Sequence, residues 1–174
     1  MNASLKKYIA RFESLQGIPS EEELRNSVVG LHREQLSIEE YIRFSGTGYQ
    51  RNVLHASSTC EVVALCFKPG QYTPIHDHGG SVGIAFVYKG TMTEELFEKQ
   101  QPSGMIAPFA KNSVSANEVS CIGISTIHRV SNVHDDGLVV LTVYFPPLVT
   151  MNIYNTENTL VEKWTAEAQR EQYS

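Results

Sequence analysis

The chain has 174 residues, of which 41% are hydrophobic and 19% charged, and its formal net charge is -5. This balance is that of an ordinary globular protein, and the length suits a single domain, 1–174, with a sizeable core. The sequence contains no run of Lys or Arg. We therefore expect neither nucleic acid nor an anionic membrane surface as a partner.

The expected compartment follows from the first residues and from the cysteines. MNASLKKYIARFESLQ lacks the apolar core of a signal peptide, and no later stretch approaches a membrane span. Cys60, Cys66 and Cys121 are odd in number and widely spaced. This pattern indicates reduced thiols rather than a disulfide framework or a structural zinc knot. The sequence predicts a cytoplasmic protein.

Residues 1–45 are predicted to form helices that cover one side of a core. Apolar residues recur there at helical spacing, after Ser4 as a possible cap: Leu5, Ile9, Phe12 and Leu15. Ser20 with Glu23 forms a capping box, which marks a helix start, and Ser37 with Glu40 repeats the pattern. We expect packing rather than chemistry from this helical cap.

Residues 49–150 have a different texture, with short β-rich runs between turn residues. The predicted strands are Glu61–Lys68, Val82–Lys89, Thr93–Glu98, Glu118–Ile122 and Leu138–Phe145. Turn residues separate them, as at Pro69-Gly70 and Asp136-Gly137. Many short strands at this spacing predict a mainly β protein, an antiparallel sandwich or barrel.

The last segment, 158–174, is predicted to be a short C-terminal helix followed by a polar tail. Its apolar residues, Leu160, Val161 and Trp164, form a patch at helical spacing.

Two histidines one residue apart give the chain its clearest chemical signal. His76 and His78 lie in an extended segment, where alternate side chains share a face, so both can bind one metal ion. Asp77 between them must point the other way. Imidazole pairs suit iron, zinc, copper and nickel better than magnesium or calcium. The alternative is a pair of ordinary surface or core histidines.

The spacing around these histidines resembles the first motif of the cupin superfamily. Gly70, His76, His78, Gly83 and Gly90 follow one another at the motif's intervals, with Gly83 where most cupins have glutamate. Further along, IHRVSN resembles the second motif and supplies His128 and Asn132. The resemblance implies a cupin jelly-roll (double-stranded β-helix) barrel with His76, His78 and His128 converging inside it.

Within the cupins, the chain resembles the cysteine dioxygenase (thiol dioxygenase) family, in which three histidines hold Fe(II). The matching segments, in the family's order, are YQRN, PIHDHGGSVG, IHRVSN and VYFPPL. The resemblance makes His76, His78 and His128 the iron ligands. It makes Arg51 the clamp for a substrate carboxylate and Tyr144 a hydroxyl over the iron, with Tyr49 beside them in substrate binding. A guanidinium suits a carboxylate because its planar fork of donors matches the two oxygens.

The activity implied is oxidation of a small thiol by O2, with both oxygen atoms placed on sulfur to give a sulfinic acid. Arg51 favours L-cysteine, because relatives that oxidise 3-mercaptopropionate usually carry glutamine there. Another small thiol such as 3-mercaptopropionate remains an alternative, as do a non-catalytic metal-binding cupin and a cupin isomerase or lyase. The oligomeric state is left open.

The chain departs from the family pattern at three positions. Gly83 occupies the place of the cysteine that crosslinks to the tyrosine in vertebrate enzymes, so that crosslink cannot form. Val140 and Thr142 replace a serine and a histidine on the strand that leads to Tyr144. Thr142 retains a hydroxyl, but it cannot hold a proton as imidazole does.

Overall fold

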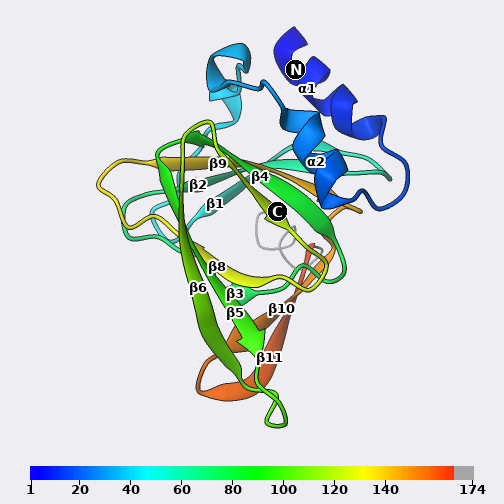
Figure 1. Cartoon of the computed structure of the whole chain (residues 1–174). Helices are drawn as coiled ribbons and strands as arrows, with labels where there is room; N and C mark the ends of the chain where they lie inside the picture. Colours follow the sequence, from blue (N-terminus) through cyan, green and yellow to red (C-terminus); the bar gives the residue numbers. More distant parts are fainter. Residues whose placement is uncertain (167–174) are drawn as a thin grey trace.

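The computed structural model describes residues 1–166, and of residues 158–161 only the backbone (Figure 1). Its helical elements are α1 (Ala3–Glu13), α2 (Glu21–Val28) and the short 3-10 helices η1 (Arg33–Gln35) and η2 (Glu39–Tyr41). The strands follow in chain order: β1 (Gln50–Ala56), β2 (Glu61–Phe67), β3 (Ile75–His76), β4 (Val82–Lys89), β5 (Thr91–Lys99), β6 (Ile106–Ser115), β7 (Val119–Ile122), β8 (Ile127–Ser131), β9 (Leu138–Phe145), β10 (Thr150–Asn155) and β11 (Asn158–Thr165).

The strands form two sheets that face each other. One has the order β1-β2-β9-β4-β7 and the other the order β11-β10-β3-β8-β5-β6, and every pairing is antiparallel. The sheets enclose an interior without closing into one continuous hydrogen-bonded barrel. The predicted mainly β, jelly-roll architecture is confirmed.

The N-terminal helices cover the outer face of the first sheet (Figure 1). Leu5, Tyr8 and Phe12 of α1 are buried in one apolar cluster with Val62, Ala64 and other residues of β2, β4 and β9. A second cluster fills the space between the sheets, and it includes alternate residues of the same strands, such as Val63 and Leu65. Strand β2 is buried along its whole length because both of its faces are covered.

The helix starts agree only partly with the sequence prediction. The capping box of Ser20 and Glu23 is present at the start of α2, as predicted. Helix α1 begins two residues earlier than expected, because Asn2, not Ser4, is the N-cap and accepts the bond from Leu5 N. The helix predicted after Ser37 is reduced to the single turn η2, since the Ser37 hydroxyl bonds the Glu39 side chain rather than a backbone amide.

The predicted C-terminal helix is wrong over Asn158–Thr165, which form β11. This strand pairs with β10 through a tight turn, and Trp164 packs against the interior cluster. Pairing with a neighbouring strand outweighs local spacing in such a short segment. The rest of the predicted helix and tail, 167–174, lies outside the described residues.

Strand β3 lies in the segment around His76 that was predicted to be extended. Strands β1, β6, β8 and β10 were not predicted as strands, because their residues lack a clear apolar alternation. Strand β6 shows the reason: it is an edge strand with mostly exposed side chains. Pro108 is tolerated there beside an irregularity in the pairing with β5.

Among the residues that the structure describes, no helix has the length and apolarity required to cross a membrane. The cytoplasmic location stays a prediction.

Candidate metal centre

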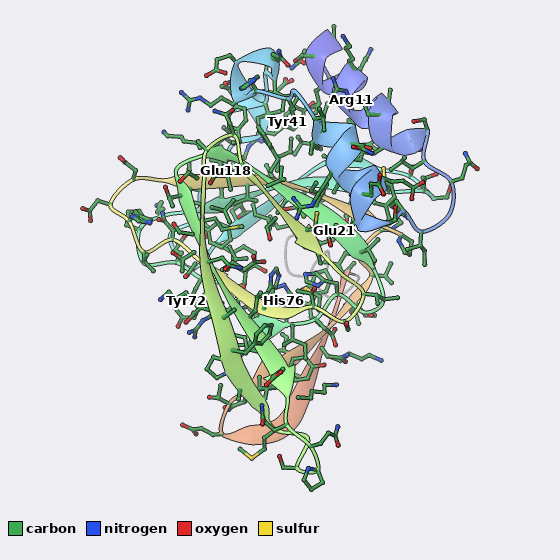
Figure 2. All side chains as sticks on the ribbon, in the orientation of Figure 1. Arg11, Glu21, Tyr41, Tyr72, His76 and Glu118 are labelled. Atoms are coloured by element: carbon green, nitrogen blue, oxygen red, sulfur yellow. The ribbon has the colours of Figure 1, made fainter. Side chains whose placement is uncertain are left out.

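Three histidines meet in the space between the two sheets, where Figure 2 shows His76. His76 ends β3 and lies directly opposite His128 of β8, while His78 follows in the turn after β3. The ring centroids are 4.9 Å apart for His76 and His78 and 4.8 Å apart for each of these with His128. All three side chains are buried. The fold therefore brings together the three residues that were predicted to bind one metal.

Hydrogen bonds fix the orientation of two of these rings. His76 Nδ1 donates to the backbone oxygen of Pro74 at 2.9 Å, and His128 Nδ1 donates to Glu94 Oε1 at 2.7 Å. Each bond places the proton on Nδ1 and leaves Nε2 with a free lone pair. A metal-binding histidine commonly has this arrangement, because the hydrogen bond sets its tautomer and its ring orientation.

His78 is different, because neither of its ring nitrogens makes a hydrogen bond although both are buried. The backbone carbonyl of Thr126 lies near the ring but outside hydrogen-bonding geometry. A buried polar nitrogen without a partner costs about 1–3 kcal/mol. A metal ion between the three rings would satisfy it, and one ligand atom from each histidine lies within 4.8 Å of the others.

Lowered pKa values favour the neutral form of His76 and His78, the form in which imidazole binds a metal. Burial, and then the nearby His128, lowers the pKa of His76 to about 3. Burial lowers the pKa of His78 well below its usual value, and the other two histidines add to the effect. Neutral imidazoles with free lone pairs fit iron, zinc, copper or nickel.

Tyr144 of β9 lies beside the three histidines. Its ring centroid is 5.8 Å from that of His78, and burial raises the pKa of its hydroxyl, an effect that the nearby Arg51 opposes. Gly83 pairs with Tyr144 across the sheet. A Cβ atom at Gly83 would collide with the backbone oxygen of Val143 and come within 3.3 Å of the Tyr144 ring. Glycine at this position permits the close approach of β4 to β9.

Arg51 of β1 forms an ion pair with Glu61 of β2, which the sequence did not predict. The two side chains are only 9% and 10% exposed. Arg51 lies opposite Leu65, a residue of the interior cluster, and Glu61 lies opposite Tyr144. The guanidinium also lies 6.0 Å from the centre of the Trp164 ring. The charge of Arg51 is therefore already neutralised by Glu61, next to Tyr144.

The model of the cysteine dioxygenase type I family matches residues 22–157, which is most of the chain. The chain belongs to this family.

Curated members of the cysteine dioxygenase family are similar at a modest level. Cysteine dioxygenase type 1 of Rattus norvegicus is 28% identical over 119 residues, which are 66% of this chain and 60% of that protein. The protein of Danio rerio is 26% identical over 140 residues, 77% of this chain and 69% of that protein. The chain thus matches about 60% of the length of the rat relative.

Solved structures agree on the fold. A conserved protein with a double-stranded β-helix domain from Klebsiella pneumoniae has a TM-score of 0.55 and 18% identity, and the match covers 69% of this chain and 96% of that one. A sugar phosphate isomerase of the cupin superfamily from Silicibacter pomeroyi has a TM-score of 0.52 and 16% identity, covering 69% and 73%. At such identities they support the cupin fold alone.

In this member of the cysteine dioxygenase family, Asp77 points away from the metal centre, as the sequence predicted. Its carboxylate accepts bonds from Asn152 N at 2.9 Å, Asn152 Nδ2 at 2.8 Å and the Tyr154 hydroxyl at 2.7 Å. These bonds anchor β10 to the turn that carries His78. Tyr49 stacks on Phe67, with ring centroids 5.2 Å apart, at the border of the interior cluster. Its role in substrate binding stays a prediction.

Glu94 of β5 is a site residue that sequence reasoning missed. It is buried, and besides His128 it accepts a bond from Ser120 Oγ at 2.7 Å. Burial alone would raise the pKa of this carboxyl, but the bonds from His128 and Ser120 bring it below the ordinary value. The available signal was weak: Glu94 alternates with apolar Met92 on an inward-facing strand.

We expect Glu94→Gln to weaken metal binding about 10- to 100-fold, the usual effect of removing such a partner from a ligating histidine. The amide is neutral and no longer raises the basicity of the His128 ring. Titration of Fe(II) or Co(II) under anaerobic conditions measures the change. Glu95→Gln is the matched control, since Glu95 pairs with Arg129 at the surface. Equal affinities in the two variants would contradict the role given to Glu94.

Proposed function

We propose that this chain is a non-haem Fe(II) dioxygenase that oxidises L-cysteine with O2 to cysteine sulfinic acid. The observation that carries the proposal is the set of three buried imidazoles that converge in a chain of the cysteine dioxygenase family. His76, His78 and His128 would hold the metal, and three neutral ligands would leave its full positive charge for an anionic thiolate.

Bound iron would supply the activation that O2 needs to react with a thiol. The protein's part is to bind, orient and exclude water. A small cavity of about 20 Å³ lies beside His76, His128 and Tyr144. Its other walls are mostly apolar and include Leu65 and Val140. Such a wall keeps bulk water from the reacting atoms.

The ion pair of Arg51 and Glu61 supports a substrate that carries both charges. Arg51 can bind a carboxylate through its planar fork, and Glu61 can accept a bond from an ammonium group. L-Cysteine offers both groups. 3-Mercaptopropionate offers only a carboxylate, which would meet the like charge of Glu61. Tyr144, opposite Glu61, has a hydroxyl that can donate to a carboxylate or to an oxygen atom.

We expect Glu61→Gln to raise kcat/KM for 3-mercaptopropionate about 10- to 100-fold relative to that for L-cysteine, the scale of one charge-assisted hydrogen bond. Glutamine retains an acceptor for Arg51 while removing the negative charge. Glu95→Gln removes a similar charge at the surface and should leave the ratio unchanged. An unchanged ratio in Glu61→Gln would refute selection by Glu61.

A metal-binding protein without catalysis is the second candidate. The ion pair favours this function in one respect: Arg51 is already bound to the buried Glu61, so its guanidinium is not free for a substrate carboxylate. The two functions are separated by oxygen uptake after anaerobic loading with Fe(II), measured with L-cysteine, 3-mercaptopropionate and cysteamine. Uptake driven by L-cysteine and lost in His128→Ala supports the dioxygenase. Tight iron binding with no uptake on any thiol supports the binding protein.

A further inference from the structure

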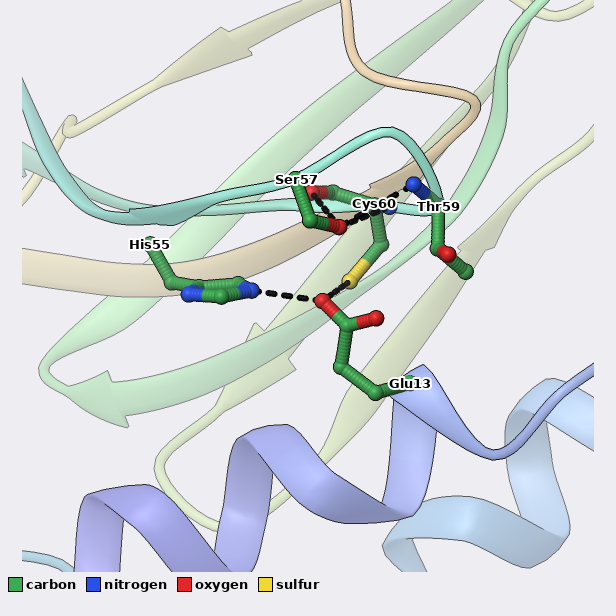
Figure 3. A network of polar contacts seen from close by, with 5 residues as sticks. All are labelled: Glu13, His55, Ser57, Thr59 and Cys60. Atoms are coloured by element: carbon green, nitrogen blue, oxygen red, sulfur yellow. Dashed lines mark hydrogen bonds and ion pairs between the residues drawn. The ribbon is translucent and has the colours of Figure 1, made fainter.

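A second group of potential metal ligands lies on the other side of the first sheet, where α1 meets the β1–β2 hairpin (Figure 3). Glu13 is the last residue of α1, His55 belongs to β1, and Cys60 directly precedes β2. His55 Nε2 lies 2.5 Å from Glu13 Oε1, and Cys60 Sγ lies 3.6 Å from the same oxygen. Three different ligand types therefore converge on one point.

The geometry suits a small divalent ion. Zinc–sulfur bonds of about 2.3 Å and zinc–oxygen bonds of about 2.0 Å at tetrahedral angles place the two ligand atoms about 3.5 Å apart. The 3.6 Å between Cys60 Sγ and Glu13 Oε1 agrees with this separation. The contact of His55 with Glu13 is a direct hydrogen bond, which would lengthen to about 3.3 Å around an ion. Both of these side chains are partly exposed, at 25% and 31%, and have room to adjust.

The hairpin turn holds Cys60 in place for this role. Ser57 Oγ accepts bonds from Thr59 N at 3.0 Å and Cys60 N at 3.2 Å, and Ser57 N donates to Cys60 O at 3.0 Å (Figure 3). On the other strand, the pairing with β2 is irregular between Val53 and His55. The thiol is thus fixed by backbone bonds, while the more exposed ligands can close on an ion.

The local charges also favour a cation. Burial, and then the negative charge of Glu13, raises the pKa of the Cys60 thiol to about 12. The Cys60 thiol points at the Glu13 carboxylate and donates a hydrogen bond to it. A divalent cation bound there would convert the thiol to a thiolate ligand, with release of its proton.

We propose that Glu13, His55 and Cys60 form a second metal site, separate from the three-histidine centre, that takes a zinc-like divalent cation. Thiolate, imidazole and carboxylate together select zinc or cobalt over magnesium and calcium. Solvent can supply the fourth ligand because Glu13 and His55 are partly exposed. The ion would connect α1 to the hairpin and hold the N-terminal helix on the sheet.

Cobalt(II) is the probe, because only this second site offers a thiolate. The full chain and three variants, His128→Ala, Cys60→Ser and Cys66→Ser, are titrated with Co(II) without any thiol present. We expect a thiolate-to-cobalt charge-transfer band in wild type and in His128→Ala, and its loss in Cys60→Ser. Cys66→Ser is the control, since Cys66 is a buried thiol that accepts a hydrogen bond from Asn52 Nδ2. It should keep the band.

A second variant and a second measurement separate loss of ligation from loss of folding. His55→Gln, at a partly exposed position, should fold and lose the thiolate-to-cobalt band. Zn(II) should raise the melting temperature of His128→Ala and leave that of the double variant His128→Ala/His55→Gln unchanged. A band that survives in Cys60→Ser, or its absence from folded His128→Ala, would overturn the second site without affecting the proposed dioxygenase activity.

Discussion

Arg51→Met is expected to lower the free energy of unfolding by about 3–5 kcal/mol, the cost of leaving one charge of a buried pair without its partner. The Glu61 carboxylate is 10% exposed and would lose the guanidinium that neutralises it. Methionine retains the length and the apolar body of the side chain, so packing changes little. Chemical denaturation of the wild type and the variant measures the difference.

A double variant tests whether the loss comes from the pair itself. In Arg51→Met/Glu61→Met both charges are gone, and we expect stability near that of the wild type or above it. Binding of L-cysteine should nevertheless be lost in this variant, since neither charge remains for the substrate. The single variants Arg51→Met and Glu61→Met complete the comparison. If the double variant loses as much stability as the two single variants together, the side chains do not interact.

His78→Leu is expected to make the metal-free protein more stable by about 1–3 kcal/mol, because it removes two buried nitrogens that have no hydrogen bond. Metal binding should be lost at the same time. In the wild type, Fe(II) at 100 times its dissociation constant adds about 2.7 kcal/mol, and this gain should be absent from the variant. Unfolding with and without Fe(II) under anaerobic conditions measures both effects.

His76→Leu is the matched control. His76 donates a hydrogen bond to the part-buried carbonyl of Pro74, so replacing His76 removes that bond and should lower the stability of the metal-free protein. If His78→Leu raises the free energy of unfolding and His76→Leu lowers it, while both variants lose metal binding, His78 is retained for binding rather than for folding. A destabilised His78→Leu would contradict this interpretation.

The ligand set could be predicted from the sequence because it depends on short-range geometry. A two-residue interval in an extended segment fixes His76 and His78 on one side, and the family motif supplies His128. The charged partners could not be predicted in this way. Glu61 and Glu94 reach Arg51 and His128 through cross-strand register, which depends on pairings over 10 and 34 residues of sequence.

The C-terminal segment shows a second limit of sequence reasoning. A helical period fits Leu160, Val161 and Trp164, but β10 offers backbone groups for pairing beside them, and the segment pairs there as β11.

Gly83 shows a third limit. The sequence indicated the chemistry that this glycine prevents, whereas the structure adds a packing reason, the close approach of Val143 and Tyr144.

In the proposed reaction, this chain adds both atoms of one O2 molecule to the sulfur of L-cysteine. The most direct measurement is the mass of the sulfinate formed by the Fe(II)-loaded protein under ¹⁸O2, with His128→Ala as the control. We expect two ¹⁸O atoms in the product of the wild-type protein and no sulfinate from the variant. A product with one ¹⁸O atom or none, or equal product from His128→Ala, would contradict the proposed reaction.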